Sequence, residues 1–170
     1  MNRHLNATGR GTKGELIIGL PGETKESFVC GVEQIIDAGV SMVCIYSLML
    51  LHGTPFRNPD YRRRFEIQGK FRLVPLNFGE YAGTRVFDIE ETGITTKDMA
   101  FDDYLWLRKL CLVIEVISNN RPFLSLFRQA SVMGFKPSAF IMCVYRSIEQ
   151  APKRVQDVVN GFMEETRGEL

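Results

Sequence analysis

The sequence predicts an α/β fold followed by a helical region, and three observations support this prediction. Two short runs of almost continuous apolar residues, 15–20 and 42–51, are typical of strands. One amphipathic helical segment separates them. Near residue 95 the pattern changes to apolar helical segments. We therefore expect two domains, residues 1–95 with the strands and residues 96–170 as a small helical bundle.

The first expected strand, residues 15–20, is bounded by glycines and by Pro21. A nearly continuous apolar run of this length is typical of a strand buried on both faces, as in a parallel sheet. Residues 21–23, Pro-Gly-Glu, predict a turn. Thr24 can then cap the helix that follows, because its hydroxyl can accept a hydrogen bond from a backbone N–H group of the first turn.

The helix after this turn carries one apolar stripe with the spacing i, i+4, i+7 and i+8. The stripe consists of Phe28, Val32, Ile35 and Ile36. Gly39 stands where a left-handed residue commonly ends a helix. The second apolar run is broken by residues 52–55, His-Gly-Thr-Pro. Strand, helix and strand in this order predict one βαβ unit with parallel strands and a right-handed crossover.

The rest of the chain divides into an irregular middle and a helical end. In the middle we expect a short helix at 62–68, a brief strand at 71–75 and a half-exposed strand at 84–90, where side chains alternate. Apolar periodicity then predicts four helices that pack as a bundle. They span residues 101–118, 122–134, 138–149 and 153–166.

Composition and charge exclude several classes of partner. The net charge is +1, so no global excess of positive charge indicates a nucleic-acid-binding protein. No stretch stays apolar for the roughly 20 residues of a membrane span, and the first residues lack the apolar core of a signal peptide. We therefore expect a cytoplasmic protein that binds neither nucleic acid nor membranes. The basic residues Arg62, Arg63, Arg64, Lys70 and Arg72 are expected to form a solvated face.

The titratable residues show no convergent pattern. The four cysteines are far apart in the sequence and have apolar neighbours, so we expect buried structural thiols and no metal site in this chain. The acidic residues Glu90, Glu91, Asp102 and Asp103 occur as adjacent pairs. We expect them on a solvated face or in the first turn of a helix rather than as a general acid and base.

Two motifs resemble the last third of a radical S-adenosylmethionine barrel. The first, residues 15–24, reads ELIIGLPGET, and the second, residues 47–55, reads SLMLLHGTP. Residues 73–79 and 99–105 are similar to the tail of the branch that also carries an amino-terminal cobalamin-binding domain. That family has a partial (β/α)6 TIM-like barrel. The resemblance implies that this chain is the carboxy-terminal fragment of such a barrel, with its fifth and sixth strands, followed by the helical bundle.

The resemblance also implies a binding site for S-adenosylmethionine at the carboxyl ends of the two strands, where such folds bind ligands. Ile17 matches the apolar position that contacts the adenine, and Gly19 would let the backbone approach the ligand. Backbone groups near Leu51 and His52 would face the adenine. The chain departs from the family where Glu15 replaces a usual glycine and His52 a frequent proline. Plainer explanations stay open: a core residue, turn glycines and a surface histidine.

The cysteine motif of the family, CxxxCxxC, is absent from this sequence, as are the first four strands. In the family this motif holds the 4Fe–4S cluster that cleaves S-adenosylmethionine reductively. We therefore assign no catalytic residue and no metal ligand to this chain and expect it to be inactive alone. Met1 is interpreted as an internal residue or a truncated start. The expected partner is the missing amino-terminal half of the barrel. The resemblance also allows a cobalamin-binding domain in the full-length protein. The substrate is unknown.

Two other functions remain open at this point. One is a non-catalytic α/β-helical interaction module, because a half-barrel has an unpaired strand edge and uncovered apolar surface. The other is a nucleotide or phosphate binder that uses residues 19–24 as an anion-binding turn. The chain lacks both glycine-rich phosphate motifs, GxxxxGKS and GxGxxG, so the second alternative has little support.

Overall fold

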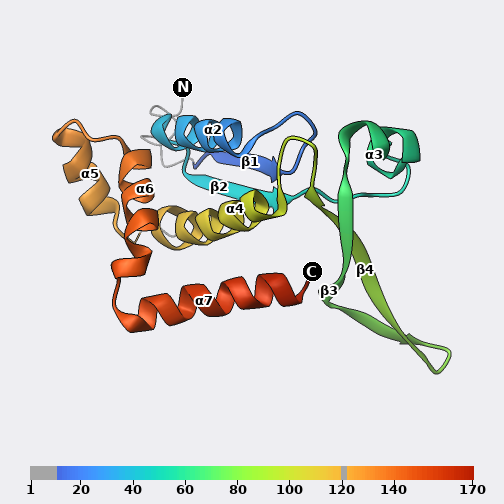
Figure 1. Cartoon of the computed structure of the whole chain (residues 1–170). Coiled ribbons are helices and arrows are strands. Elements are labelled where there is room, and N and C mark those ends of the chain that lie inside the picture. Colours follow the sequence, from blue (N-terminus) through green and yellow to red (C-terminus); the bar gives the residue numbers. More distant parts are fainter. Residues whose placement is uncertain (1–10, 120–121) are drawn as a thin grey trace.

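The expected βαβ unit forms the first layer of the protein. A computed structural model describes residues 11–119 and 122–170. In it, β1 (Lys13–Ile18) and β2 (Met42–Ser47) pair in parallel, and α2 (Lys25–Asp37) connects them (Figure 1). The register places Ile18 opposite Ser47, so both strands end at the same edge. The parallel pairing is confirmed, although both strands end earlier than expected.

Local sequence explains where α2 begins and ends. The Thr24 hydroxyl accepts a hydrogen bond from the Ser27 N–H group at 3.2 Å, and the Ser27 hydroxyl accepts one from the Thr24 N–H group at 3.0 Å. This reciprocal pair gives a hydrogen-bond acceptor to two backbone N–H groups at the start of α2. At the other end Gly39 has φ +77°, a left-handed conformation that glycine adopts without strain. Both predicted boundaries are confirmed.

The second apolar run does not continue as one strand. After Ser47 the chain leaves β1 and pairs with a later strand, since the Gly93 N–H donates to the Leu48 carbonyl and the Leu50 N–H to the Glu91 carbonyl, each at 2.8 Å. Leu48 and Leu50 are buried by this contact. Their apolar character reflects this second interface. It explains why the run extends beyond the end of β2.

The middle of the chain folds into one short helical region and a long hairpin. The two helical elements are η1 (Pro55–Arg57) and α3 (Pro59–Phe65). β3 (Gln68–Tyr81) and β4 (Thr84–Thr95) then pair in antiparallel fashion. Both strands are longer than expected, and they extend away from the body as an arm (Figure 1). Ala82 (φ 50°) and Gly83 (φ 79°) form its two-residue turn, whose left-handed geometry suits the twist of a hairpin.

The carboxy-terminal part is helical, as expected. Its elements are α4 (Phe101–Ile114), the π-helical segment η2 (Glu115–Asn119), α5 (Leu124–Val132), α6 (Pro137–Ser147), η3 (Ile148–Gln150) and α7 (Lys153–Gly168). The Asn119 side chain bonds both backbone groups of Val43, accepting from its N–H and donating to its carbonyl, each at 2.9 Å. Asn119 thereby occupies part of the free edge of β2 as another strand would.

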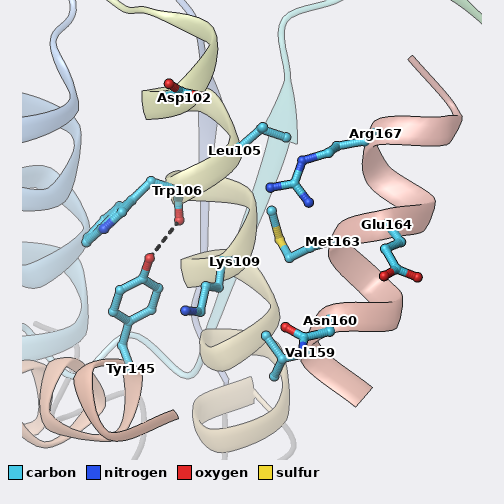
Figure 2. A pocket seen from close by; sticks show the side chains of 10 residues that line it. All are labelled: Asp102, Leu105, Trp106, Lys109, Tyr145, Val159, Asn160, Met163, Glu164 and Arg167. Carbon is cyan, nitrogen blue, oxygen red and sulfur yellow. Dashed lines mark hydrogen bonds between the residues drawn. The ribbon is translucent and has the colours of Figure 1, made fainter. Parts of the chain in front are cut away.

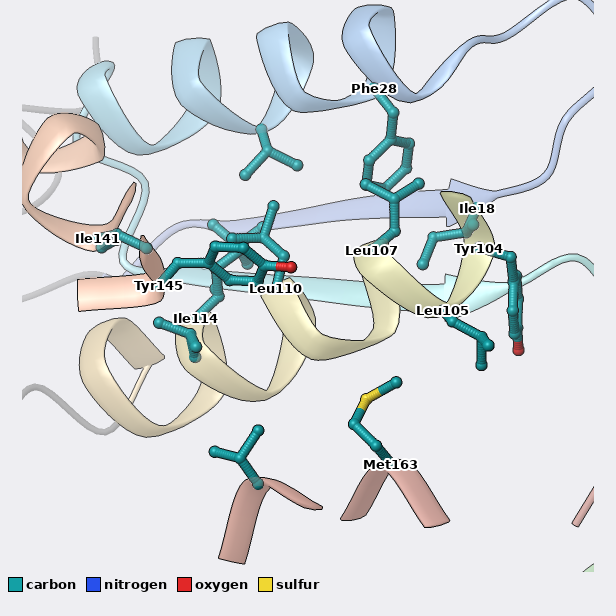
Figure 3. Packing of buried hydrophobic residues seen from close by; sticks show 14 of the residues in the cluster. Ile18, Phe28, Tyr104, Leu105, Leu107, Leu110, Ile114, Ile141, Tyr145 and Met163 are labelled. Atoms are coloured by element: carbon teal, nitrogen blue, oxygen red, sulfur yellow. The ribbon is translucent and has the colours of Figure 1, made fainter. Parts of the chain in front are cut away.

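One hydrophobic core joins the strands and the helices. It includes Ile18 of β1, Phe28 of α2, Leu107 of α4, Ile141 of α6 and Met163 of α7. Phe28 and Leu107 point toward each other, with the strands behind them (Figure 3). The helices therefore pack on the sheet as well as on one another, and the core is continuous across residue 95. Over the described residues the fold is mixed α/β, with two two-stranded sheets and no closed barrel.

Membrane-spanning potential is confined to one pair of segments in the described part of the chain. No single helix there is long and apolar enough to cross a bilayer. The bent pair Phe101–Asn119 and Leu124–Val132 reaches the required length and apolar composition only when both helices are taken together.

Candidate functional site

The β1–β2 sheet has one covered and one open face. Leu16, Ile18, Val43 and Ile45 alternate along the strands toward the core under α2 and α4. The other face, which we call the open face, carries the remaining side chains of both strands. These are Lys13, Glu15, Ile17, Met42, Cys44 and Tyr46. Ile17 and Tyr46 lie opposite each other and remain 40% and 48% exposed, so an apolar surface near the strand ends is available to a ligand.

Gly19 lies directly beyond the end of β1. Its φ is +91°, which disfavours any side chain. A Cβ atom added there would be 3.7 Å from the Gly93 carbonyl oxygen, which is ordinary contact distance. The left-handed backbone, rather than crowding, therefore favours glycine at this position. Ile17 thus lies in β1 near its end, and Gly19, which is buried, lies just beyond that end.

Leu51 and His52 lie beside a different group of residues. Both are exposed, and His52 Nε2 lies 2.7 Å from the Arg57 guanidinium. A guanidinium only donates hydrogen bonds, so Nε2 accepts and the ring proton resides on Nδ1. Within the described residues, no hydrogen bond or ion pair joins His52 or Leu51 to Ile17 or Gly19. Ile17 and Gly19 therefore lie at the end of β1, whereas Leu51 and His52 follow the end of β2 at Ser47 by several residues.

A buried carboxylate organises the surroundings of His52. Glu91 of β4, whose side chain is 5% exposed, pairs with Arg57 of η1 and with Arg62 of α3, the latter at 2.8 Å. We call these three residues the Glu91 cluster. A Cβ atom at Gly69 would lie 2.6 Å from a Glu91 carboxylate oxygen, so a glycine is needed opposite the cluster.

The Glu91 cluster corrects two sequence expectations. Glu91 was expected on a solvated face, and Arg62 within a solvated basic run, yet Glu91 is buried and pairs with the partly buried Arg62. Arg72 of the same run also pairs with Glu90, at 2.5 Å. The burial of Glu91 arises from contacts of β4 with η1 and α3, which are distant in sequence, so no local pattern indicated it.

A polar group lies on the open face at the amino-terminal half of the strands. Lys13 Nζ lies 2.5 Å from a Glu15 carboxylate oxygen and donates to the Tyr46 hydroxyl at 3.5 Å. The hydrogen bond to Glu15, followed by that to Tyr46, raises the pKa of Lys13. Lys13 is therefore a cation at neutral pH that Glu15 already pairs, and it is unsuited to acting as a base.

Apart from the open face, a hollow of about 400 Å³ lies between α4 and α7 (Figure 2). The Tyr145 hydroxyl donates to the Trp106 carbonyl at 3.5 Å, and burial raises the pKa of Tyr145 to about 12. Lys109 Nζ lies 5.0 Å from the centre of the Tyr145 ring. Arg167 points toward α4, and Glu164 of α7 also lines the hollow (Figure 2). None of the four residues predicted to bind S-adenosylmethionine lines this hollow.

The thiols differ from the expected pattern. Cys30 and Cys143 are exposed, so the expectation that all four cysteines are buried is wrong; their apolar neighbours face the core instead. Burial raises the pKa of Cys111 to about 12, which keeps it protonated at neutral pH. In the described part of the chain no three Cys, His, Asp or Glu side chains are grouped so that they could hold a metal ion.

The turn before α2 offers little to a phosphate. The Gly22 N–H group donates to the Asp98 carboxylate at 3.1 Å, so an anion in this turn would meet a negative charge. The first-turn N–H group of Ser27 is already bonded to Thr24. This geometry argues against the nucleotide- or phosphate-binding alternative.

Comparison of the sequence with protein-family models gives no match, and comparison with curated proteins gives none either. Function is therefore argued from the geometry of the open face and the strand ends.

Proposed function

We propose that this chain is the carboxy-terminal part of a radical S-adenosylmethionine barrel and that its open face contributes to the adenosyl pocket. One observation carries the proposal. Two parallel strands end at the same edge, their helices cover one face, and the opposite face is open at Ile17 and Tyr46. In a parallel barrel the helices lie outside and the other strand face lines the interior, where ligands bind at the carboxyl ends.

The free edge of β1 supports the same proposal. β1 has β2 as its one strand neighbour in the described residues. A preceding strand of a barrel would pair along that edge, in the direction already set by β1. The opposite edge of β2 is partly closed by Asn119, as suits a last strand.

Each of these residues would contact a different part of a bound adenosyl group. Ile17 and Tyr46 would form an apolar and aromatic surface for the planar base. Gly19 would admit it close to the backbone. Leu51 and His52 would border the pocket, with the His52 ring held by Arg57.

The cluster of the family does not fit the described residues of this chain, because the cysteines are not grouped. A 4Fe–4S cluster would therefore be held by the missing half of the barrel, and no redox step is assigned to these residues. We likewise assign no residue to cobalamin.

The proposal is tested by titrating the isotope-labelled chain with S-adenosylmethionine and following backbone amide signals by NMR. We expect saturable shifts at Ile17 and Gly19, with smaller shifts at Leu51 and His52. The variant Ile17→Asp should weaken binding at least ~10-fold, because a charge would replace apolar contact. Met42→Asp is the matched control, since Met42 lies on the same face at the opposite end of β2. Shifts confined to the α4–α7 hollow, or equal effects of both variants, would contradict the proposal.

The interaction module remains the second candidate function, and the exposed side chains of the arm favour it. Phe78 of β3 and Ile89 of β4 are 70% and 63% exposed. Apolar exposure of this kind on a projecting hairpin marks an association surface.

A further inference from the structure

The arm formed by β3 and β4 has two chemically different faces. Residues directly opposite each other in an antiparallel pair share a face. Leu73 pairs with Ile89, Phe78 with Phe87, and Phe71 with Glu91. The apolar members of this face, which we call the arm face, are all more than half exposed. They are Phe71 (59%), Leu73 (62%), Phe78 (70%), Phe87 (54%) and Ile89 (63%).

The other face of the arm turns toward the body at its base, where its residues are charged, and carries the exposed Tyr81 and Val86 near its tip. Arg72 pairs with Glu90 across the strands at 2.5 Å and reaches Glu169, just after α7, at 3.8 Å. Lys70 Nζ lies 5.6 Å from the centre of the Phe101 ring at the start of α4. These contacts orient the base of the arm, where Glu91 of the arm face is buried by Arg57 and Arg62, while the five apolar residues of this face stay exposed.

An uncovered surface of this kind is unfavourable in water. With ~150–250 Å² available on each aromatic side chain, the arm face exposes on the order of 500 Å² of apolar area. That value is at the upper end of the patches found on monomers. A two-stranded ribbon is also only marginally stable without a packing partner.

We propose that the arm face is a homodimer interface, in which the arms of two copies stack face to face about a two-fold axis that runs along the arm. Such an axis places β3 of one copy over β4 of the other. Phe78 then lies opposite Phe87 of the partner subunit, and Leu73 opposite Ile89 of the partner subunit. The strip is therefore self-complementary, as an isologous contact requires.

Charge and area agree with this arrangement. Glu80 and Arg85 are paired positions at the tip of the same face, so Glu80 would lie opposite Arg85 of the partner subunit. Two arm faces would bury on the order of 1,000 Å², which is the lower limit for a specific protein interface. An apolar centre with charged residues at its end is the usual composition of such an interface.

The test is the oligomeric state of the full chain, measured by sedimentation equilibrium. We expect a dimer, and Phe78→Ser or Phe87→Ser should weaken it at least ~10-fold. Val86→Ser is the control, because Val86 is next to Phe87 but on the opposite face of the arm. Circular dichroism establishes that each variant is folded.

A charge exchange tests the geometry without removing apolar residues. Glu80→Arg should weaken the dimer, because two arginines would face each other in each copy of the contact. Glu80→Arg combined with Arg85→Glu should restore it. A monomer at ~100 μM would overturn the proposal, and so would a dimer whose stability these variants do not change. A monomer that binds an added half-barrel would overturn it by assigning the arm face to that partner. Since the arm face excludes Ile17 and Gly19, binding of S-adenosylmethionine tests the proposed function separately.

Discussion

Glu91 of β4 connects two elements that precede it in the sequence, η1 and α3. Its carboxylate is buried, accepts a hydrogen bond from Arg57 and forms an ion pair with Arg62, and the two arginines belong to two different elements. Arg57 in turn contacts His52. A charge removed from water remains ionised only when it is paired and hydrogen-bonded, so the three side chains depend on one another. The geometry of one predicted site residue therefore follows from a carboxylate on a distant strand.

Replacing Glu91 should be costly. Glu91→Gln leaves two partly buried guanidiniums without a negative partner, and we expect the free energy of unfolding to fall by about 3 kcal/mol. Urea unfolding measures the change, and the NMR signals of the His52 ring report its altered surroundings. Asp60→Asn is the control, since Asp60 pairs with Arg63 in an exposed position where such contacts contribute about 0–1 kcal/mol. Similar losses in both variants would refute the special role of Glu91.

Asp103 connects the start of α4 to α2 in a pH-dependent way. Lys25 Nζ lies 2.6 Å from its carboxylate, and this hydrogen bond lowers the pKa of Asp103 below its ordinary value. The stabilisation is thus present above the pKa of an unfolded aspartate, about 3.9, and is lost as the pH falls through the lower folded value.

We therefore expect Asp103→Asn to lower the melting temperature at pH 7, with the difference shrinking as the pH falls below the ordinary aspartate pKa of about 3.9 and through the lower folded value. Thermal melts across this range measure it. Asp157→Asn provides the comparison, because Asp157 pairs with Lys153 on an exposed surface. A difference that stays constant at all pH values would show that the ionised pair is not its origin.

Among the elements, α2 is the one that local residues specify most completely. Its cap, apolar stripe and left-handed end all lie within a few residues of the positions they affect. Phe28, Val32 and Ile36 are buried as the spacing predicts. The arm is the opposite case, because alternation predicted strand segments there but not their pairing. Its turn contains Ala82, a residue seldom found at positive φ, so the usual hairpin signal is weak.

The cap of α2 provides an element-scale prediction. Thr24→Ala removes the acceptor for the Ser27 N–H group, and we expect a loss of about 1 kcal/mol in the free energy of unfolding. Thr24→Ser keeps the hydroxyl and should recover most of it. Chemical denaturation of the original protein and both variants measures the free energy of unfolding. Equal losses for alanine and serine would exclude the cap as the cause.

At the scale of the whole molecule, one core extends across the expected domain boundary. Leu107 of α4 packs in the same cluster as Ile18 of β1 and Phe28 of α2. Shared burial couples the stability of the parts on either side of residue 95, since neither can unfold without exposing the other.

We accordingly expect a single unfolding transition. Trp106, the one tryptophan of the sequence, reports on α4, whereas far-ultraviolet circular dichroism reports on all helices. The two signals should change at the same urea concentration. Two separated transitions would instead support residues 1–95 and 96–170 as independent domains.

Residues close together along the chain contain the information for α2, its boundaries and the parallel pairing of β1 with β2. Cap bonds, helical periodicity and a crossover of this length are short-range properties, so the order of residues predicts them. The burial of Glu91 between Arg57 and Arg62, the packing of α4 on the sheet and the exposure of the arm face have another origin. They arise from contacts between segments that are distant in sequence, and desolvation by those contacts separates a buried charge from a solvated one.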